Sequence, residues 1–181
     1  MDQPDIITER LQPRSFTLDD AADVQRLAGN YNVAKMTLNI PHPYEDGMAE
    51  AWIETHGEIR AAGSNIAYAI TLRSTGGLIG CISLDDLDGT SGSLGYWIGE
   101  PYWGQGICTE AAIAIIRFAF DDIRLDRIYS VHLVSNPASG RVMQKIGMIH
   151  TGTSQAPGRL GGEMDVETYE ILNKRTDSDG Q

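Results

Sequence analysis

The most constraining feature of the sequence is a glycine turn placed between a strand-like run and a helix-like run. Residues 102–111 read Y-W-G-Q-G-I-C-T-E-A, after the short β-like run 94–98 and before the apolar run 112–120. A strand, a tight turn and a helix start bring several backbone N–H groups to one point, at the positive end of the helix dipole. The stretch therefore predicts a phosphate-binding site.

Two nucleotide-binding motifs also place glycines at such a turn, and the residues argue against both. The dinucleotide fingerprint G-x-G-x-x-G requires a third glycine where Thr109 stands. The next strand-like run, 127–134, leads into Ser135 and Asn136, where a ribose-binding carboxylate would be expected. No Lys-Ser or Lys-Thr pair follows the glycines, as a P-loop requires. An oxidoreductase with a nicotinamide nucleotide is therefore the less favoured alternative.

The turn resembles the acyl-CoA turn of the GNAT superfamily of N-acetyltransferases, and the resemblance extends over nearly the whole chain. The superfamily pattern is Arg or Gln, two residues, Gly, one residue, then Gly or Ala, and it falls on Trp103, Gly106 and Cys108. Residues 103–111 are similar to a branch that includes ribosomal-protein N-terminal alanine and serine acetyltransferases. So are residues 136–148, N-P-A-S-G-R-V-M-Q-K-I-G-M, and the opening T-E-R-L at 8–11.

The resemblance implies an α/β (α+β) GNAT fold, with a mixed, mostly antiparallel central sheet of about six to seven strands, splayed between strands 4 and 5 and flanked by about four helices. Periodicity and turn residues lead to nearly the same order. Strands are predicted at 6–16, 65–72, 78–84, 92–98, 127–134 and 166–172, and helices at 17–29, 44–61, 109–120 and 137–146. Pro13 should make the first an edge or bulged strand.

Composition limits the kinds of partner. A chain of 181 residues with 41% hydrophobic content fits one domain, 1–181, with loose tails at 1–5 and 174–181. The formal charge of −11 argues against nucleic acid and favours cationic partners, although it also serves solubility alone. Cys81 and Cys108 suggest neither a metal site nor a disulfide framework. No signal peptide and no membrane-spanning run are seen, so a cytoplasmic location is expected.

The resemblance implies acetyl-CoA as the co-substrate, bound mainly by backbone amides. Amides of the glycine turn would hold the pyrophosphate, exposed amides of the fourth strand would pair with the pantetheine arm, and side chains after the fifth strand would close the other wall. The residues expected to bind acetyl-CoA are Trp97, Ile98, Gly104, Gln105, Gly106, Ile107, Cys108, Thr109, Asn136 and Ser139.

The acceptor amine must lose a proton before it attacks, because an alkylammonium has no lone pair. Many superfamily members place a glutamate on the fourth strand for this purpose, and the corresponding positions here are Gly92 and Ser93. The residue that acts as the base is therefore left unassigned. The candidates are Glu163, Asp165, Glu100 and His132, and Glu163 is preferred because residues 161–166 border the acceptor cleft in the family.

The departing CoA thiolate needs a proton or a nearby donor. The tyrosine that serves many members aligns with Met143, which cannot donate, whereas the ribosomal-protein branch has a serine at the position of Ser139. Ser139 is therefore predicted as the donor, although a thiolate leaves well enough that no acid is essential. Cys108 lies inside the phosphate turn, where a structural role is favoured over covalent catalysis.

These residues predict an N-acetyltransferase that transfers an acetyl group from acetyl-CoA to a primary amine in a ternary complex. The alternative is a catalytically inactive acyl-CoA-binding module, since both the strand glutamate and the tyrosine are missing. The acceptor is left open between a protein N-terminus and a small-molecule amine, and the oligomeric state between monomer and homodimer. Residues that could touch the acceptor, if they do not simply pack, are Asn39, His42, Tyr44 and Trp52.

Overall fold

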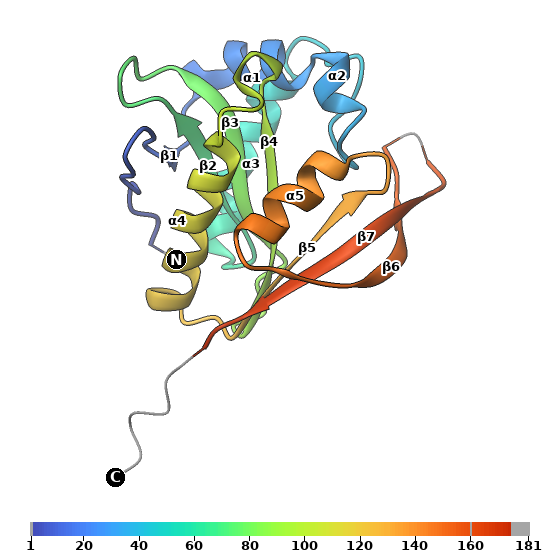
Figure 1. Cartoon of the computed structure of the whole chain (residues 1–181). Coiled ribbons are helices and arrows are strands. Elements are labelled where there is room, and N and C mark those ends of the chain that lie inside the picture. The colour runs from blue at the N-terminus through green and yellow to red at the C-terminus, as the bar shows by residue number, and fades with distance from the viewer. Residues whose placement is uncertain (1, 160, 175–181) are drawn as a thin grey trace.

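One central sheet contains all the strands found in residues 2–159 and 161–174, and helices cover both of its faces (Figure 1). The computed structural model describes residues 2–159 and 161–174. The strands are β1 (Arg14–Ser15), β2 (Ile66–Thr71), β3 (Leu78–Asp85), β4 (Ser91–Ile98), β5 (Arg127–Leu133), β6 (Ile149–Pro157) and β7 (Glu163–Leu172). The α-helices are α1 (Ala21–Ala28), α2 (Tyr31–Ala34), α3 (Met48–Ala61), α4 (Ile107–Asp121) and α5 (Pro137–Lys145).

The seven strands are ordered β1-β2-β3-β4-β5-β7-β6, and every neighbouring pair is antiparallel except β4 and β5. These two parallel strands pair only from Ser91 to Ser93 on β4 and from Arg127 to Tyr129 on β5. Beyond that point they part, so their carboxyl-terminal halves border a gap. The mixed sheet splayed between its fourth and fifth strands, as the resemblance implied, is confirmed.

Alternating side chains divide the sheet into two faces with separate cores. On β4, Leu94 and Ile98 lie in the core under α4 and α5, and Tyr96 packs against it. Trp97 points the other way, into a second core formed with α1 and α3. Figure 1 shows α4 and α5 in front of the sheet and α3 behind it. We call the second side the α1/α3 face.

The first predicted strand, 6–16, is largely wrong. Only Arg14–Ser15 forms the edge strand β1, because residues before it turn back on themselves: the Ile6 N–H donates to the Pro13 carbonyl at 2.9 Å. The Thr8 N–H likewise donates to the Leu11 carbonyl at 3.0 Å. Proline at 13 has no amide for the ladder, as expected, and the chain uses the preceding stretch for a turn instead.

The segment between the first two predicted helices is also more ordered than expected. The predicted loop 30–43 contains α2, whose first turn is capped by the side chain of Asn30. The predicted helix 44–61 begins only at Met48, after Gly47 at φ +83°. Met48 and Ile59 of this helix are 38% and 37% exposed, whereas Ile53 is buried.

The predicted loose tails lie partly outside the described residues, which end at Lys174. At the other end, Gln3 donates from Nε2 to the Ala67 carbonyl at 2.8 Å and accepts from Arg60 at 2.8 Å. This part of the N-terminal segment is therefore held against β2. Within 2–159 and 161–174, no helix is long and apolar enough to cross a membrane.

Candidate active site

The predicted phosphate turn lies between β4 and α4, with its amides free. Gly104 and Gly106 adopt left-handed backbone angles, φ +75° and +76°, and Gly106 directly precedes the first residue of α4. Such angles are natural for glycine and strained for other residues. Among the described residues, none accepts a hydrogen bond from the N–H groups of 106–109. Because the first amides of a helix have no partner within it, these groups are available to an anion.

A clamp from the N-terminal segment holds this turn in place. Glu110 on α4 accepts from the Thr8 hydroxyl at 2.6 Å and from the Arg10 backbone N–H at 2.9 Å, and it pairs with Arg10 Nε at 2.6 Å. Arg10 also donates from Nη1 to the Gln105 carbonyl at 2.9 Å. Burial alone would raise the pKa of Glu110, but the hydrogen bonds from Thr8 and Arg10 outweigh it and lower that pKa.

Sequence reasoning missed this clamp. The helix dipole sufficiently explains a carboxylate in the first turn of α4, so the sequence alone indicates no further role for Glu110. The signal that could have revealed the clamp was the joint presence of T-E-R-L at 8–11 and T-E-A at 109–111. Arg10 is therefore a basic side chain beside the phosphate turn that the motif itself does not contain.

The edge of β4 that borders the gap carries unpaired backbone groups. The Gly99 N–H donates to Ile79 of β3, and since alternate residues of a strand face alternate neighbours, Tyr96 and Ile98 present their N–H groups to the gap. The Ile98 carbonyl accepts from Trp103 Nε1 at 2.6 Å. Of the two predicted pantetheine contacts, Ile98 faces the gap, whereas the backbone of Trp97 faces β3.

The first turn of α5 forms the opposite wall of the gap. Asn136 caps the helix, and its Nδ2 donates to the Met36 carbonyl beyond α2 at 3.1 Å. The Ser139 hydroxyl lies 2.8 Å from the Tyr96 hydroxyl of β4. Burial raises the pKa of Tyr96, so its hydroxyl stays protonated. Two hydroxyl groups thus meet across the gap, and Tyr96 is a residue that the sequence reasoning did not single out.

The thiol of Cys108 is unsuited to nucleophilic attack. Burial raises its pKa to about 12, so the thiolate is scarce at neutral pH. This agrees with a structural role inside the turn.

The base candidates occupy different places. Glu100 accepts from the side-chain amides of Asn30 and Asn32 at 2.7 and 2.8 Å, which ties α2 to the end of β4. His132 is buried against Gly140 of α5, away from the α1/α3 face. Asp165 accepts from Gln155 at 3.1 Å. Glu163 is exposed at the first position of β7.

Of the residues predicted to touch the acceptor, some pack in the core and others face solvent. Trp52 contacts the Phe16 ring edge to face, with centroids 5.0 Å apart, and Tyr44 packs against the same core. The Nδ1 atom of His42 lies 3.1 Å from the carbonyl oxygen of Gly29. Asn39 is exposed on the segment between α2 and α3.

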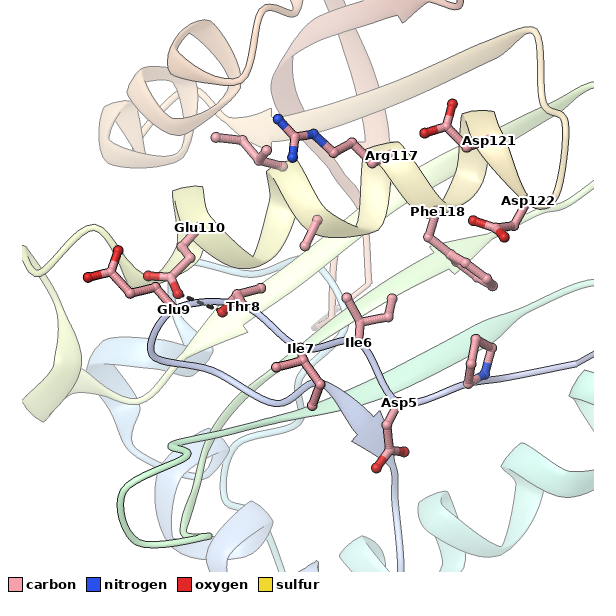
Figure 2. A pocket seen from close by; sticks show the side chains of 13 residues that line it. Asp5, Ile6, Ile7, Thr8, Glu9, Glu110, Arg117, Phe118, Asp121 and Asp122 are labelled. Carbon is pink, nitrogen blue, oxygen red and sulfur yellow. Dashed lines mark hydrogen bonds between the residues drawn. The ribbon is translucent and has the colours of Figure 1, made fainter.

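A separate pocket lies between residues 4–9 and the outer side of α4 (Figure 2). Thr8 and Glu110 meet at one end, and Asp121 and Asp122 lie at the other. Arg117 is accompanied there by several carboxylates, so the pocket is poorly suited to the phosphates of a cofactor. The gap between β4 and β5 and the α4 turn are the better candidates.

In this sheet two parallel strands separate, and the turn that follows the first of them presents free amides at the start of a helix. This arrangement defines the class of acyl-CoA-binding transferase folds. The family described as Acetyltransferase (GNAT) domain matches residues 10–149. The uncharacterized N-acetyltransferase YnaD of Bacillus subtilis is 32% identical over 172 residues, covering 93% of this chain and 97% of that protein. The chain belongs to the GNAT acetyltransferase family, and it is an enzyme of that class.

Solved structures share this fold at low identity. The ribosomal-protein-S5-alanine acetyltransferase of Vibrio fischeri superposes with a TM-score of 0.80 at 19% identity, covering 94% of this chain and 97% of its own. The spermidine N-acetyltransferase of Vibrio cholerae, solved with CoA and spermine, gives a TM-score of 0.77 at 19% identity, with coverage of 92% and 97%. At these identities the likeness shows the fold alone.

Proposed function

We propose that this protein transfers the acetyl group of acetyl-CoA to a primary amine by direct attack in a ternary complex. The observation that carries the proposal is the combination of two sets of free amides, one at the α4 turn and one on the edge of β4 that borders the gap. The first suits a pyrophosphate and the second an extended amide-bearing arm.

The residues of the α4 turn and of the two walls of the gap fit acetyl-CoA. Amides from Gly104 to Thr109 would bind the pyrophosphate, supported by the charge of Arg10, and the amides of Tyr96 and Ile98 would pair with the pantetheine arm. When bound, acetyl-CoA supplies an activated thioester. An amide that points at the carbonyl oxygen would stabilise the oxyanion, a contribution worth about 2.7–4 kcal/mol per donor in other enzymes.

Ser139 is proposed as the proton donor to the departing sulfur. Its hydroxyl lies 2.8 Å from that of Tyr96, so a proton given up by Ser139 can be replaced from the tyrosine. Asn136 would contribute through its side chain, which both caps α5 and reaches the Met36 carbonyl. Glu163 stays a prediction as the base.

The acceptor is proposed to be a cationic primary amine, either a protein N-terminus or a small molecule. The net charge of −11 favours such acceptors, and the relatives include enzymes named for a ribosomal-protein alanine and for spermidine. The cytoplasmic location and the monomeric or homodimeric state likewise remain predictions.

Radiolabelled acetyl transfer tests the proposal. The protein is incubated with acetyl-CoA and either peptides with N-terminal alanine or serine, or spermidine, and acetylated product is counted. We expect transfer to at least one acceptor and binding of acetyl-CoA by calorimetry. Binding without transfer to any acceptor would instead favour a module that holds acyl-CoA without turning it over.

A further inference from the structure

The β4 position at which the resemblance implies a glutamate has a carboxylate next to it on β3. Asp85, the last residue of β3, lies directly opposite Ser93 of β4 in the antiparallel register. The next pairs toward the gap are Ser83 with Gly95 and Cys81 with Trp97. Directly opposed residues point to the same face of a sheet. Because Trp97 packs on the α1/α3 face, Asp85 and Ser93 share that face.

Gly95 makes room for the Asp85 carboxylate over β4. A Cβ atom at position 95 would lie 2.9 Å from Asp85 Oδ2 and 2.9 Å from the Ser83 hydroxyl oxygen. The carboxylate therefore occupies space that a side chain of β4 would otherwise fill. Ser93 is also the last β4 residue paired with β5, so the carboxylate lies where the two strands begin to part.

Two neutral donors orient this carboxylate. The Ser83 hydroxyl donates to Oδ2 at 2.7 Å, and the Asn65 side-chain amide donates to Oδ1. No basic side chain among residues 2–159 and 161–174 forms an ion pair with Asp85. Asp85, Ser83 and Gly95 are only partly buried, so this part of the α1/α3 face keeps some exposure to solvent.

The electrostatic surroundings favour a proton on Asp85 more than usual. Burial raises the pKa of its carboxyl first, and Asp86 raises it further, against the lowering effect of the hydrogen bonds from Ser83 and Asn65. Tyr129 of β5 faces the same region, with a pKa raised by burial and by Asp86, Asp88 and Asp85. Two further charged or titratable groups nearby are Arg127, which lies over the Tyr129 ring, and Cys81, on the same strand as Asp85.

We propose that Asp85 is the proton acceptor of the acetyl transfer, supplied by β3 in place of the missing β4 glutamate. The inference deepens the proposed function and rests on it. Asp85 takes one proton from the acceptor ammonium, directly or through one water. The freed nitrogen lone pair forms the N–C bond, the C–S bond breaks, and its electron pair leaves with sulfur. The nitrogen gives up its second proton to water, and the sulfur becomes a thiol by taking one from Ser139 or water.

The Asp85→Asn variant tests this role, because it removes the basic oxygen with little change in volume. With an N-terminal-alanine peptide and spermidine as acceptors, we expect kcat/KM at pH 7 to fall at least about 100-fold, the lower range for a general base. The dissociation constant of acetyl-CoA should change less than about twofold, since Asp85 lies on the opposite face from α4. With the peptide, the deficit should shrink as pH rises past about 8, where the α-amine is already neutral.

The exposed neighbour Asp86 supplies the matched control. Asp86→Asn removes the same charge one residue away and should retain wild-type activity within about threefold, because exposed charges act weakly across water. A second variant separates catalysis from folding. In the Asp85→Asn background, Ser93→Glu returns a carboxylate to the same face from β4, and we expect it to restore part of the lost rate.

Four outcomes overturn the proposal. If Asp85→Asn transferred acetyl groups as fast as the wild type, Asp85 would have no part in the mechanism, while the proposed function would stand. The same would hold if the activity lost in Asp85→Asn stayed constant up to pH 9.5. If Glu163→Gln lost much of the transfer activity and Asp85→Asn lost none, the proton acceptor would be Glu163 of β7. A wild type that binds acetyl-CoA but acetylates neither acceptor would reject the proposed function and the role of Asp85 together.

Discussion

The phosphate turn and the partly buried region around Asp85 on the α1/α3 face are built in opposite ways. The turn consists of consecutive residues between β4 and α4, and its amides point outward because of two left-handed glycines. On the other face, Asp85 and Ser83 come from β3 and Asn65 directly precedes β2. They meet Ser93 of β4 only through strand register. The first region is therefore a local motif, whereas the second is a product of sheet pairing. Variants that disturb one region should leave the other intact.

The largest effect is expected from Gly106→Val. A β-branched residue does not tolerate φ +76°, so the turn must rearrange and displace its amides. Hydrogen bonds to charged groups contribute about 1.5–3 kcal/mol each, so losing two of them should weaken acetyl-CoA binding at least about 100-fold. Calorimetric titration measures this loss.

Gly63→Val is the matched control for that variant. Gly63 has nearly the same angle, φ +75°, with nothing within 4 Å of its would-be Cβ, and it lies in the turn after α3. Its substitution should lower thermal stability by a similar strain while leaving acetyl-CoA affinity unchanged. Equal losses of affinity in both variants would mean that general destabilisation, rather than the turn, explains the first result.

A smaller effect is expected where the two walls of the gap meet. Ser139→Ala and Tyr96→Phe should each lower kcat about tenfold at saturating acetyl-CoA, less than a full general acid because a thiolate leaves readily. Since the two hydroxyls are 2.8 Å apart, the double variant should be little worse than either single one. The exposed Ser135→Ala serves as control. Losses that multiply would show that the two hydroxyls act separately.

The clamp around Glu110 should have a still smaller effect, because its ion pair is partly exposed. Side chains of Arg10 and Glu110 are 45% and 18% exposed, and such pairs contribute little by themselves. Arg10→Ala should weaken acetyl-CoA binding about three- to tenfold, since it removes both a nearby charge and the bond to the Gln105 carbonyl. Arg26→Ala, which breaks the surface pair with Asp23, is the control and should not change affinity.

The smallest expected effect concerns stability and involves His56 of α3, whose ring packs against Phe16 and Trp52. Burial, and then Arg60, lowers the pKa of His56 to about 4, below the ordinary value of 6.5. The unfolded chain thus takes up a proton at a pH where the folded protein does not, and stability should decline as pH falls from about 6.5 toward 4. In His56→Phe the urea midpoint should fall less over that range, whereas the exposed His42→Gln should behave as wild type.

Local signals in the sequence predicted a large part of the donor side. The glycine turn, the Asn136 cap and Pro137 at the start of α5 lie where their residue types require. The resemblance added the parting of β4 and β5, which periodicity cannot reveal because it depends on how two distant strands pair. The short α2 and the turn at 8–11 were missed, since neither has a periodic apolar pattern.

The sequence by itself determined where a phosphate could bind, because consecutive backbone angles fix that geometry. Only the tertiary structure decided which carboxylate lies beside Ser93 and Gly95 on the α1/α3 face. Asp85 and Ser93 are joined by an antiparallel register in which a shift of one residue would move the carboxylate to the opposite face. The same register places Gly95 beside Asp85, and it follows from the packing of the whole sheet rather than from any single stretch of chain.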